Sequence, residues 1–507
     1  MSIGKVWLVG AGPGDAGLMT VKGRAVLADA DVVVYDALVG DAILAMIPDR
    51  ARAIDAGKRS GDHTLHQWET NELLLREALA GNRVVRLKGG DPFLFGRGGE
   101  ELELLRQHGV PFEVVPGVTS PVAVPAYNGI PVTHRDLTSS LHIVTGHRRA
   151  GASYDIDFRA LVATGGTLVF LMGLAALEDI VKGLLEAGMA PDMPAAVLSH
   201  GTTAAQRRVT ATVGTLPERV RAARLSAPAI IVVGRVCALS EDFAWYERLP
   251  LAGFKAVVTR PRELCSALSE KLRALGAEVV ELPAIATEPI PDNARLYEAL
   301  EHLERYRWLV LTSPSGVRIF FDEMRARGAD VRRLAGLKVG ALGEGTRAAL
   351  AERGILADVM PGVYDGDALG AALAAAAAPG DRFLLPRARI GNREILERLS
   401  TFEVDDIPLY ETVYCAPKAV DARRMFEEGV SCALFTSSSA VRAFAAANPE
   451  LDYALVRAGC IGEKTAATAR GLGMQVRVAE KATLESLVAL AMRMHAEQNG
   501  TQGGKEA

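Results

Sequence analysis

The 507-residue chain has few cysteines, no long apolar run and no excess of charge of one sign. Its five cysteines lie far apart and form no CxxC pair, so we expect reduced thiols. The net charge is −4, which gives no basic field for nucleic acid. The single close histidine pair, His63 and His66, has no third ligand nearby in the sequence. We therefore predict no metal site and no nucleic-acid partner.

The apolar segments also argue against a membrane protein. The longest uncharged apolar stretch, residues 161–177, is interrupted by Thr164, Gly165, Gly166 and Gly173. It predicts a buried strand with loops rather than a membrane span. The N-terminus lacks a charged segment followed by an apolar one, so we expect no signal peptide and a cytoplasmic location.

The chain is too long for one hydrophobic core, and its pattern predicts an α/β fold in two or three domains. A boundary is expected near residues 240–254, because 227–236 indicates a closing strand and 255–261 a new first strand. Residues 368–380 predict an alanine-rich helix, and 496–507 a disordered tail. The expected strands include 5–9, 31–35, 84–87, 114–115, 142–145 and 167–172, and the expected helices include 68–80 and 100–108.

The second half of the chain contains an internal repeat. Residues 308–320 (WLVLTSPSGVRIF) match 432–444 (CALFTSSSAVRAF), and residues 339–355 match 458–474. Each pair indicates a strand, a loop of small residues and a helix, in the same order. The repeat therefore predicts two similar α/β lobes.

The first glycine-rich loop, VGAGPGD at residues 9–15, departs from the dinucleotide fingerprint. Asp15 stands where G-x-G-x-x-G requires glycine, and Pro13 removes a backbone donor. The loop indicates a tight turn over an uncharged part of a ligand. A strand-to-helix turn without a ligand is the alternative.

Two further loops favour a ligand. Residues 86–101 (RLKGGDPFLFGRGGEE) contain Gly89 and Gly90, which permit close approach to the backbone, and Asp91, which can accept from a ribose or an amino group. Residues 114–136 are again rich in glycine, proline and hydroxyl groups. Because such loops follow successive strands, we expect them to meet at one sheet edge.

The N-terminal half, residues 3–240, resembles uroporphyrinogen-III C-methyltransferase, a member of the tetrapyrrole methylases. The segments that carry the resemblance are, in order, VGAGPGD, VVYDALV, GKR, RLKGGDPFLFGRGGEE, VPGVTS, AYNGIPVTHRD, TGH, LMG, HGTTAAQ and APAIIVVG. The resemblance implies two α/β lobes with S-adenosylmethionine (SAM) bound in the cleft between them. SAM carries an activated methyl group, so no metal is required.

The resemblance also implies roles for individual residues. Asp36 is the implied proton acceptor and Lys58 the implied proton donor; from the residues alone, Asp36 fits a turn and Lys58 a surface position. Leu94 stands where the family often has isoleucine, and Ser120 where alanine is common. The implied SAM site consists of Pro13, Gly89, Gly90, Asp91, Leu94, Thr119, Ser120, Met172 and Gly201.

The implied substrate, uroporphyrinogen III, carries eight carboxylates, and guanidinium groups suit them. Among Arg59, Arg97, Arg135, Arg148 and Arg149 we predict Arg97 and Arg135 as substrate ligands. We expect a homodimer through this half and no membrane partner.

The C-terminal half resembles uroporphyrinogen-III synthase, which converts hydroxymethylbilane to uroporphyrinogen III. The segments that carry the resemblance are VVTRP, LGAEVVELPAI, LVLTSPSGVRIFF, VGALGEGTRAAL, FLLPRARIGNREILERL, PLYETV, LFTSSSAVRAF and IGEKTAATARGLG. The implied domains are a methyltransferase at 1–245 and a synthase at 253–495. In the synthase, lobe one comprises 253–286 with 416–495, and lobe two comprises 287–415.

In this half the resemblance implies Tyr410 as an acid that assists loss of hydroxide, with Arg387 as a weaker candidate for binding carboxylates. The implied substrate-binding hydroxyl groups belong to Thr312, Ser313, Thr436, Ser437, Ser438 and Thr465. Each hydroxyl group also fits a helix N-cap, and capping is compatible with ligand binding.

Taken together, the two resemblances predict a bifunctional enzyme of the sirohaem and cobalamin pathway that makes uroporphyrinogen III and methylates it twice to precorrin-2. The alternative is another tetrapyrrole methylase fused to a two-lobed ligand-binding module.

Overall fold

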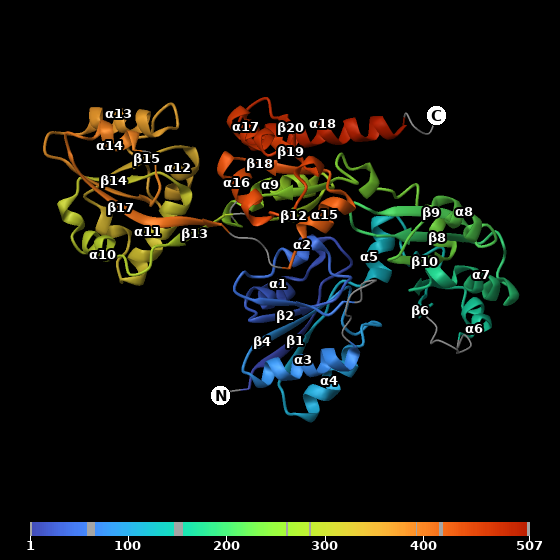
Figure 1. The fold of residues 1–507 in the computed structure, drawn as a ribbon. Coiled ribbons are helices and arrows are strands. Elements are labelled where there is room, and N and C mark those ends of the chain that lie inside the picture. Colours follow the sequence, from blue (N-terminus) through green and yellow to red (C-terminus); the bar gives the residue numbers. More distant parts are fainter. Residues whose placement is uncertain are drawn as a thin grey trace. The chain divides into compact units, whose positions relative to one another are not determined.

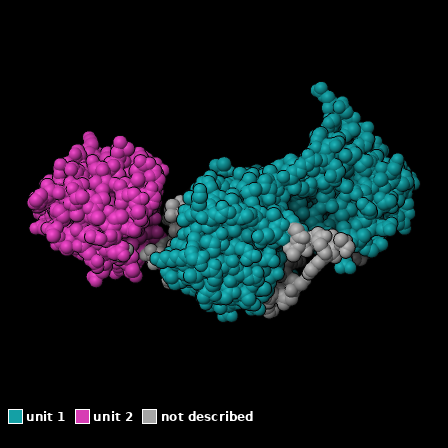
Figure 2. All heavy atoms as spheres, turned by 90° about the horizontal axis from the view of Figure 1, so that it is seen from above, with its two compact units in different colours: residues 1–284, 415–507 teal, residues 285–414 magenta. Residues whose placement is uncertain are grey.

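The computed structural model describes residues 3–57, 66–146, 156–259, 262–282, 285–391, 393–414 and 419–503. These residues form four five-stranded sheets, two in each half of the sequence (Figure 1). The chain divides into two compact units, residues 1–284 with 415–507 and residues 285–414 (Figure 2). Along the described ranges, no helix combines the length and apolarity needed to cross a membrane.

The first sheet is parallel, with strand order β3-β2-β4-β1-β5. Alternate residues of its strands enter different clusters, with Val33 and Tyr35 in one and Val32 and Val34 in the other. Both faces are covered at β2, which is why this strand is a continuous apolar run. The elements are β1 (Lys5–Gly10), η1 (Ala16–Leu18), α1 (Val21–Ala28), β2 (Val32–Tyr35), α2 (Asp41–Leu44), β3 (Arg52–Asp55), α3 (Gln67–Leu79), β4 (Arg83–Lys88), α4 (Gly98–Gln107) and β5 (Phe112–Val115).

The second sheet is mixed, with order β6-β7-β10-β8-β9. Its last strand, β10, inserts between β7 and β8 and is antiparallel to both. The elements are α5 (Ser120–Tyr127), β6 (Leu141–Thr145), α6 (Phe158–Ala163), β7 (Thr167–Leu171), η2 (Leu174–Ala176), α7 (Leu177–Glu186), β8 (Pro194–Ser199), β9 (Arg207–Thr212), α8 (Leu216–Ala223), β10 (Ala229–Val233), η3 (Arg235–Leu239) and η4 (Tyr246–Arg248).

The third sheet is parallel, with order β12-β11-β18-β19-β20, and it belongs to the same compact unit as the first two sheets. The elements are β11 (Lys255–Val258), α9 (Arg262–Ala274), β12 (Glu278–Glu281), α15 (Ala422–Gly429), β18 (Cys432–Phe435), α16 (Ser438–Ala447), η7 (Tyr453–Leu455), β19 (Arg457–Cys460), α17 (Glu463–Gly471), β20 (Gln475–Val478) and α18 (Leu484–Gly503). Because α18 continues to Gly503, the prediction of a disordered tail from residue 496 is wrong for 496–503.

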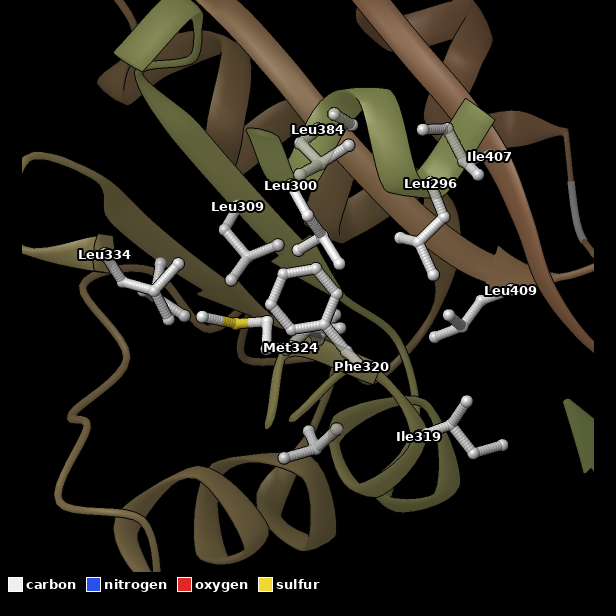
Figure 3. Close-up of a cluster of buried hydrophobic side chains, with 14 of the residues drawn as sticks. Leu296, Leu300, Leu309, Ile319, Phe320, Met324, Leu334, Leu384, Ile407 and Leu409 are labelled. Carbon is white, nitrogen blue, oxygen red and sulfur yellow. The ribbon is translucent and has the colours of Figure 1, made fainter. Parts of the chain in front are cut away.

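The fourth sheet, in the separate unit of residues 285–414, has order β13-β17-β16-β14-β15 and is parallel except for β13. Phe320 lies in the middle of its main apolar cluster, which also contains Leu300, Leu309 and Met324 (Figure 3). The elements are β13 (Ile285–Pro289), α10 (Ala294–Glu301), η5 (Leu303–Arg305), β14 (Trp308–Leu311), α11 (Pro314–Ala326), η6 (Val331–Leu334), β15 (Lys338–Ala341), α12 (Glu344–Ala351), α13 (Gly366–Ala376), β16 (Arg382–Ala388), α14 (Glu394–Arg398) and β17 (Glu403–Tyr414).

The sequence repeat corresponds to a structural repeat. The first matched pair forms β14 with α11 and β18 with α16, and the second forms β15 with α12 and β19 with α17. In both cases the two strands are parallel neighbours in one sheet. The predicted α/β fold with two similar lobes in the second half is therefore confirmed.

Candidate functional site

Three glycine loops converge at the carboxyl ends of the strands of the first sheet. Gly12 and Gly90 exchange backbone hydrogen bonds, with N···O distances of 3.2 and 2.7 Å. Gly117 packs against the same place, because an added Cβ would lie 2.2 Å from the Gly90 oxygen and 2.7 Å from the Gly10 Cα. Only glycine permits this approach, so the loops after β1, β4 and β5 form one surface.

Asp15 joins the first loop to the second sheet. Its Oδ1 accepts from the Gly17 N–H at 2.7 Å, which caps η1. Its Oδ2 accepts from the Tyr127 hydroxyl at 2.7 Å, and its own N–H donates to Thr202 Oγ1 at 3.1 Å. Asp15, the residue that departs from the dinucleotide fingerprint, therefore ties the first loop to α5 and to the loop after β8.

Asp36 and Asp91 lie in this convergence of loops, and backbone N–H groups orient both carboxylates. Asp36 accepts from Leu38 at 3.1 Å and from Gly89 at 3.3 Å, and its side chain is 24% exposed. Asp91 accepts from Phe93 at 2.8 Å and from Gly117 at 3.0 Å. Asp36 therefore closes a turn, as the alternative interpretation expects, and it is also accessible.

A buried ionic cluster lies beside Asp36, and the sequence analysis did not predict it. Glu101 Oε1 accepts from Arg86 Nε at 3.0 Å and from Lys88 Nζ at 2.9 Å, and all three side chains are less than 10% exposed. Arg86 Nη2 lies 3.9 Å from Asp36 Oδ2. Burial and the Arg86 charge lower the pKa of Lys88, although Glu101 and Asp36 act in the opposite direction.

One sequence feature could have revealed this cluster. Arg86 and Lys88 occupy alternate positions of β4, whose other buried residues are apolar, so they share one face of the sheet. A buried charge requires a partner, and α4 follows directly with Glu100 and Glu101.

The other predicted SAM residues lie around the same loops. Thr119 is the N-cap of α5, followed by Ser120, and Gly201 packs on Val124 of that helix. Leu94 packs on the apolar cluster that contains Leu171. Pro13 is half-buried, as is Gly89, which packs on Leu38. Met172 follows β7 with a positive φ of 55° and is 52% exposed.

The predicted basic residues divide into exposed ones and ones outside the described residues. Arg97 is exposed and holds Glu100 in a bidentate ion pair, with distances of 2.9 and 2.6 Å. Arg135 is exposed in the loop after α5. Lys58, Arg59, Arg148 and Arg149 lie outside the described residues.

The predicted hydroxyl groups of the C-terminal half form two sets, one in each compact unit. In the third sheet's unit, Ser437 caps α16 through the Ala440 N–H at 3.1 Å, and Thr436 precedes it. Ser438 donates to the Lys464 carbonyl oxygen at 3.0 Å, which joins the starts of α16 and α17. Thr465 is only 5% exposed, and the equivalent Thr346 is also buried, so this position favours packing.

In the unit of residues 285–414, Ser313 follows the carboxyl end of β14 and meets Tyr410, which lies within β17 opposite Ala388 at the carboxyl end of β16. Their hydroxyl oxygens lie 2.7 Å apart, and Ser313 also caps α11 through the Gly316 N–H at 2.9 Å. Thr312 is the half-buried neighbour of Ser313. Burial raises the pKa of Tyr410, and the hydrogen bond with Ser313 offsets only part of this rise. The phenol therefore stays protonated at neutral pH.

The geometry of Arg387 favours a structural role over the predicted binding of carboxylates. Its side chain is 8% exposed, and its guanidinium group binds Asp406 in a bidentate pair at 2.7 and 2.8 Å. Such a pair occupies the fork that a substrate carboxylate would need.

Comparisons with known proteins identify both halves. Residues 5–217 match the family model described as tetrapyrrole (corrin/porphyrin) methylases, and residues 266–489 match uroporphyrinogen-III synthase HemD. A porphyrin biosynthesis protein HemD from Ruminiclostridium josui is 46% identical over 96% of this chain and 97% of its own length. The chain belongs to this family of porphyrin biosynthesis proteins.

As a member of this family, the protein is a bifunctional enzyme of tetrapyrrole biosynthesis, with a uroporphyrinogen-III C-methyltransferase half and a uroporphyrinogen-III synthase half. The predicted fusion is confirmed, and the synthase match replaces the alternative of a ligand-binding module. A uroporphyrinogen-III C-methyltransferase from Bacillus subtilis is 39% identical over 70% of this chain and 73% of its own length.

A solved structure is similar to the methyltransferase half. It is the uroporphyrin-III C-methyltransferase from Thermus thermophilus, complexed with S-adenosylhomocysteine. It is 42% identical, covers 46% of this chain and 99% of its own, and has a TM-score of 0.41.

Proposed function

We propose that the synthase half closes hydroxymethylbilane to uroporphyrinogen III with inversion of ring D. The methyltransferase half then transfers two methyl groups from SAM to C2 and C7 of that product, which gives precorrin-2. The observation that carries the proposal is the position of the Asp36 carboxylate, which is accessible and fixed by the Gly89 N–H at the convergence of the glycine loops.

The residues at these loops fit a SAM-sized ligand that approaches the backbone. A Cβ added to Gly90 would meet only the Ser120 nitrogen, at 4.0 Å, so the space beside Gly90 is open. Bound SAM supplies a methyl group that its sulfonium activates for transfer to a carbon nucleophile. The residues proposed to hold SAM are Pro13, Gly89, Gly90, Asp91, Leu94, Thr119, Ser120, Met172 and Gly201.

Asp36 is the proposed proton acceptor. When a substituted ring carbon of the tetrapyrrole gains a methyl group, that carbon becomes quaternary and the ring becomes cationic, so a proton must leave from another position of the macrocycle. The Leu38 and Gly89 N–H groups hold the Asp36 carboxylate in one orientation, and Arg86 lies 3.9 Å away as a fixed positive charge. A preoriented carboxylate is suited to this proton transfer. Lys58 is the proposed proton donor on the resemblance alone.

The proposed ligands for the carboxylates of uroporphyrinogen III are Arg97 and Arg135. Arg97 is exposed, and its guanidinium group already forms a bidentate pair with the Glu100 carboxylate. Unlike the buried pair of Arg387, this pair is exposed to solvent and contributes little stability, so a substrate carboxylate can compete with Glu100 for the guanidinium group.

In the synthase half, Tyr410 is the proposed acid. Loss of hydroxide from hydroxymethylbilane requires a proton on the departing oxygen, and a phenol kept protonated by burial can donate one. Because Ser313 Oγ is fixed by the Gly316 N–H, its contact orients the Tyr410 hydroxyl. The hydroxyl groups of Thr312, Thr436, Ser437 and Ser438 are proposed to bind acetate and propionate groups. The homodimer and the cytoplasmic location stay predictions.

A coupled assay tests the proposal. The purified protein receives hydroxymethylbilane with and without SAM, and the products are separated by isomer and by methylation state. We expect uroporphyrinogen III without SAM and precorrin-2 with it. If only the type I isomer forms, the proposed synthase reaction is wrong. If uroporphyrinogen III accumulates with SAM present, the proposed methyl transfer is wrong.

A further inference from the structure

Lobe one of the synthase half contacts two loops that belong to the proposed SAM and proton-transfer site. This lobe shares one compact unit with the methyltransferase half, whereas residues 285–414 form a separate unit. Helix α2, which starts five residues after Asp36, lies against strand β12 of the synthase half (Figure 1). Ala419 and Val420 pack on the apolar cluster that includes Ile43.

The centre of this contact is a row of half-buried and buried charges. Lys255 Nζ donates to Asp41 Oδ2 at 2.8 Å and lies 3.5 Å from Glu278 Oε1. Arg424 Nη2 donates to Asp41 Oδ1 at 3.0 Å. The side chains of Asp41, Lys255 and Glu278 are 8%, 15% and 16% exposed. Burial lowers the pKa of Lys255, but Glu278 and Asp41 together outweigh burial and raise it above its ordinary value. Lys255 therefore stays protonated at neutral pH.

The other end of the row reaches the loop that follows β8. Glu278 Oε2 accepts from the Ala204 N–H at 2.8 Å. Two residues earlier, Thr202 has a positive φ of 67° and accepts from the Asp15 N–H. Gly201, next to Thr202, is a proposed SAM residue. A residue of the synthase half thus fixes the loop that carries part of the methyltransferase site.

The two anchored segments belong to different sheets of the methyltransferase half. Asp41 follows β2 of the first sheet, and Ala204 follows β8 of the second. Lys255 and Glu278 are neighbours in register on β11 and β12, so a single rigid pair of strands holds both segments. A cavity of about 40 Å³ lies beside the contact, lined by Asp15, Ala42, Thr202 and Glu278 among others, and it has room for water.

We propose that Lys255 and Glu278 of the synthase half are positioning residues for methyl transfer. They tie α2 and the loop of residues 200–206 to each other, and thereby fix the SAM-binding loops of the two methyltransferase sheets. The inference rests on the proposed function, because it assigns these residues to the SAM site named above. It implies that the methyltransferase half of this chain depends on the synthase half for its geometry.

The first test compares variants of one strand in the full chain. Glu278→Ala removes the acceptor of the Ala204 N–H, whereas Glu278→Gln keeps an acceptor oxygen there. Glu281→Ala is the matched control, because Glu281 lies on the same strand and pairs with Arg273 of its own lobe. The readouts are the Kd of SAM by calorimetry, the kcat and KM of methylation starting from uroporphyrinogen III, and the synthase rate from hydroxymethylbilane without SAM.

We expect Glu278→Ala to raise the Kd and KM of SAM about tenfold, which is the typical effect of losing a hydrogen bond to a charged acceptor. The kcat should change less than the KM, and the synthase rate should stay at the wild-type level. Glu278→Gln should restore SAM binding, and Glu281→Ala should match wild type in both reactions. Wild-type SAM binding and methylation in Glu278→Ala would overturn the proposal.

A second set of variants decides the case in which Glu278→Ala unfolds lobe one and both activities fall together. Asp41→Asn takes an acidic partner from Lys255, which keeps Glu278, and Lys255→Met takes a basic partner from Asp41, which keeps Arg424; the double variant removes the Asp41–Lys255 pair as a whole. The proposal expects weaker SAM binding in each single variant and partial recovery in the double variant, at an unchanged synthase rate. If the effects of the two single substitutions on the Kd of SAM simply add in the double variant, the proposal is wrong. A wild-type protein that does not methylate uroporphyrinogen III would instead contradict the proposed function, and the inference with it.

Discussion

The substitution Glu101→Gln tests the buried ionic cluster beside Asp36. Glu101 is fully buried, and its Oε1 is the shared acceptor of Arg86 and Lys88. Glutamine keeps the size of the side chain but removes the negative charge, and so leaves two buried cations close together. Breaking a buried ion pair by removing one partner costs about 3–5 kcal/mol. The loss of stability should therefore be large, although the shape of the side chain changes little.

The destabilisation should also depend on pH. The pKa of Lys88 is already below its ordinary value because of burial and Arg86, and Glu101 opposes this shift. Without Glu101 the pKa falls further. The unfolded chain then binds more protons than the folded chain between the folded pKa and the ordinary value of 10.5. Stability consequently rises with pH in that window, and it rises over a wider window in Glu101→Gln than in wild type.

Hydrogen exchange measured by mass spectrometry suits this chain, because it reports the opening of one sheet in a protein with several compact parts. Peptides that cover β1 and β4 should exchange on the order of 10²–10³ times faster in Glu101→Gln at neutral pH. After correction for intrinsic exchange, protection should recover as the pH is raised. Peptides that cover β14 should exchange as in wild type.

Glu103→Gln is the control, since Glu103 is exposed on the same helix, and such a change typically costs less than about 0.5 kcal/mol. If the peptides that cover β1 and β4 are equally protected from hydrogen exchange in Glu101→Gln and in Glu103→Gln, the charge of Glu101 does not hold the cluster together, and the prediction is wrong.

Three further predictions address the proposed sites. Asp36→Asn should bind SAM normally by calorimetry and methylate about 10²–10⁴ times more slowly; near-normal turnover would remove Asp36 from the mechanism. Tyr410→Phe should slow ring closure about 10²-fold in the synthase assay while the circular dichroism spectrum is unchanged; an unaltered rate would leave Tyr410 with packing alone. Gly117→Ala places a Cβ 2.2 Å from the Gly90 oxygen, so the loops must move apart, at a cost of about 1–3 kcal/mol. Calorimetry should show weaker SAM binding, and unchanged affinity would argue against a site built on that contact.

Much of the fold follows from local sequence. The continuous β-branched run of β2 is buried on both faces, and the predicted strand of residues 31–35 matches Val32–Tyr35. The insertion of β10 between β7 and β8 could not be predicted in the same way, because strand order is decided by packing between distant segments. The helical conformation of the C-terminal residues could not be predicted from local sequence either. Leu487, Leu490 and Ala491 of α18 are buried and anchor a helix that continues into a polar sequence.

The functional site was also predictable only in part. Glycines in short motifs indicated where the backbone segments approach each other, and the structure has Gly12, Gly90 and Gly117 in contact. The partners of charged groups were not predictable, because Glu101 meets Lys88 across a loop and Glu278 meets Ala204 across 74 residues of sequence. Such pairs depend on how elements pack together, and spacing along the chain does not encode them.

The capping serines show why a structural and a functional interpretation of one residue need not compete. Ser313 and Ser437 occupy equivalent positions of the repeat, and each caps its helix through the N–H three residues later. Only Ser313 also has a tyrosine hydroxyl group at 2.7 Å among the contacts of the described residues; the hydroxyl group of Ser437 lies 2.9 Å from that of Ser439. The cap fixes where Ser313 Oγ lies, and this position lets it orient Tyr410. The shared cap is therefore a property of the fold, and the chemistry that we propose for one lobe comes from the residue that β17 places beside it.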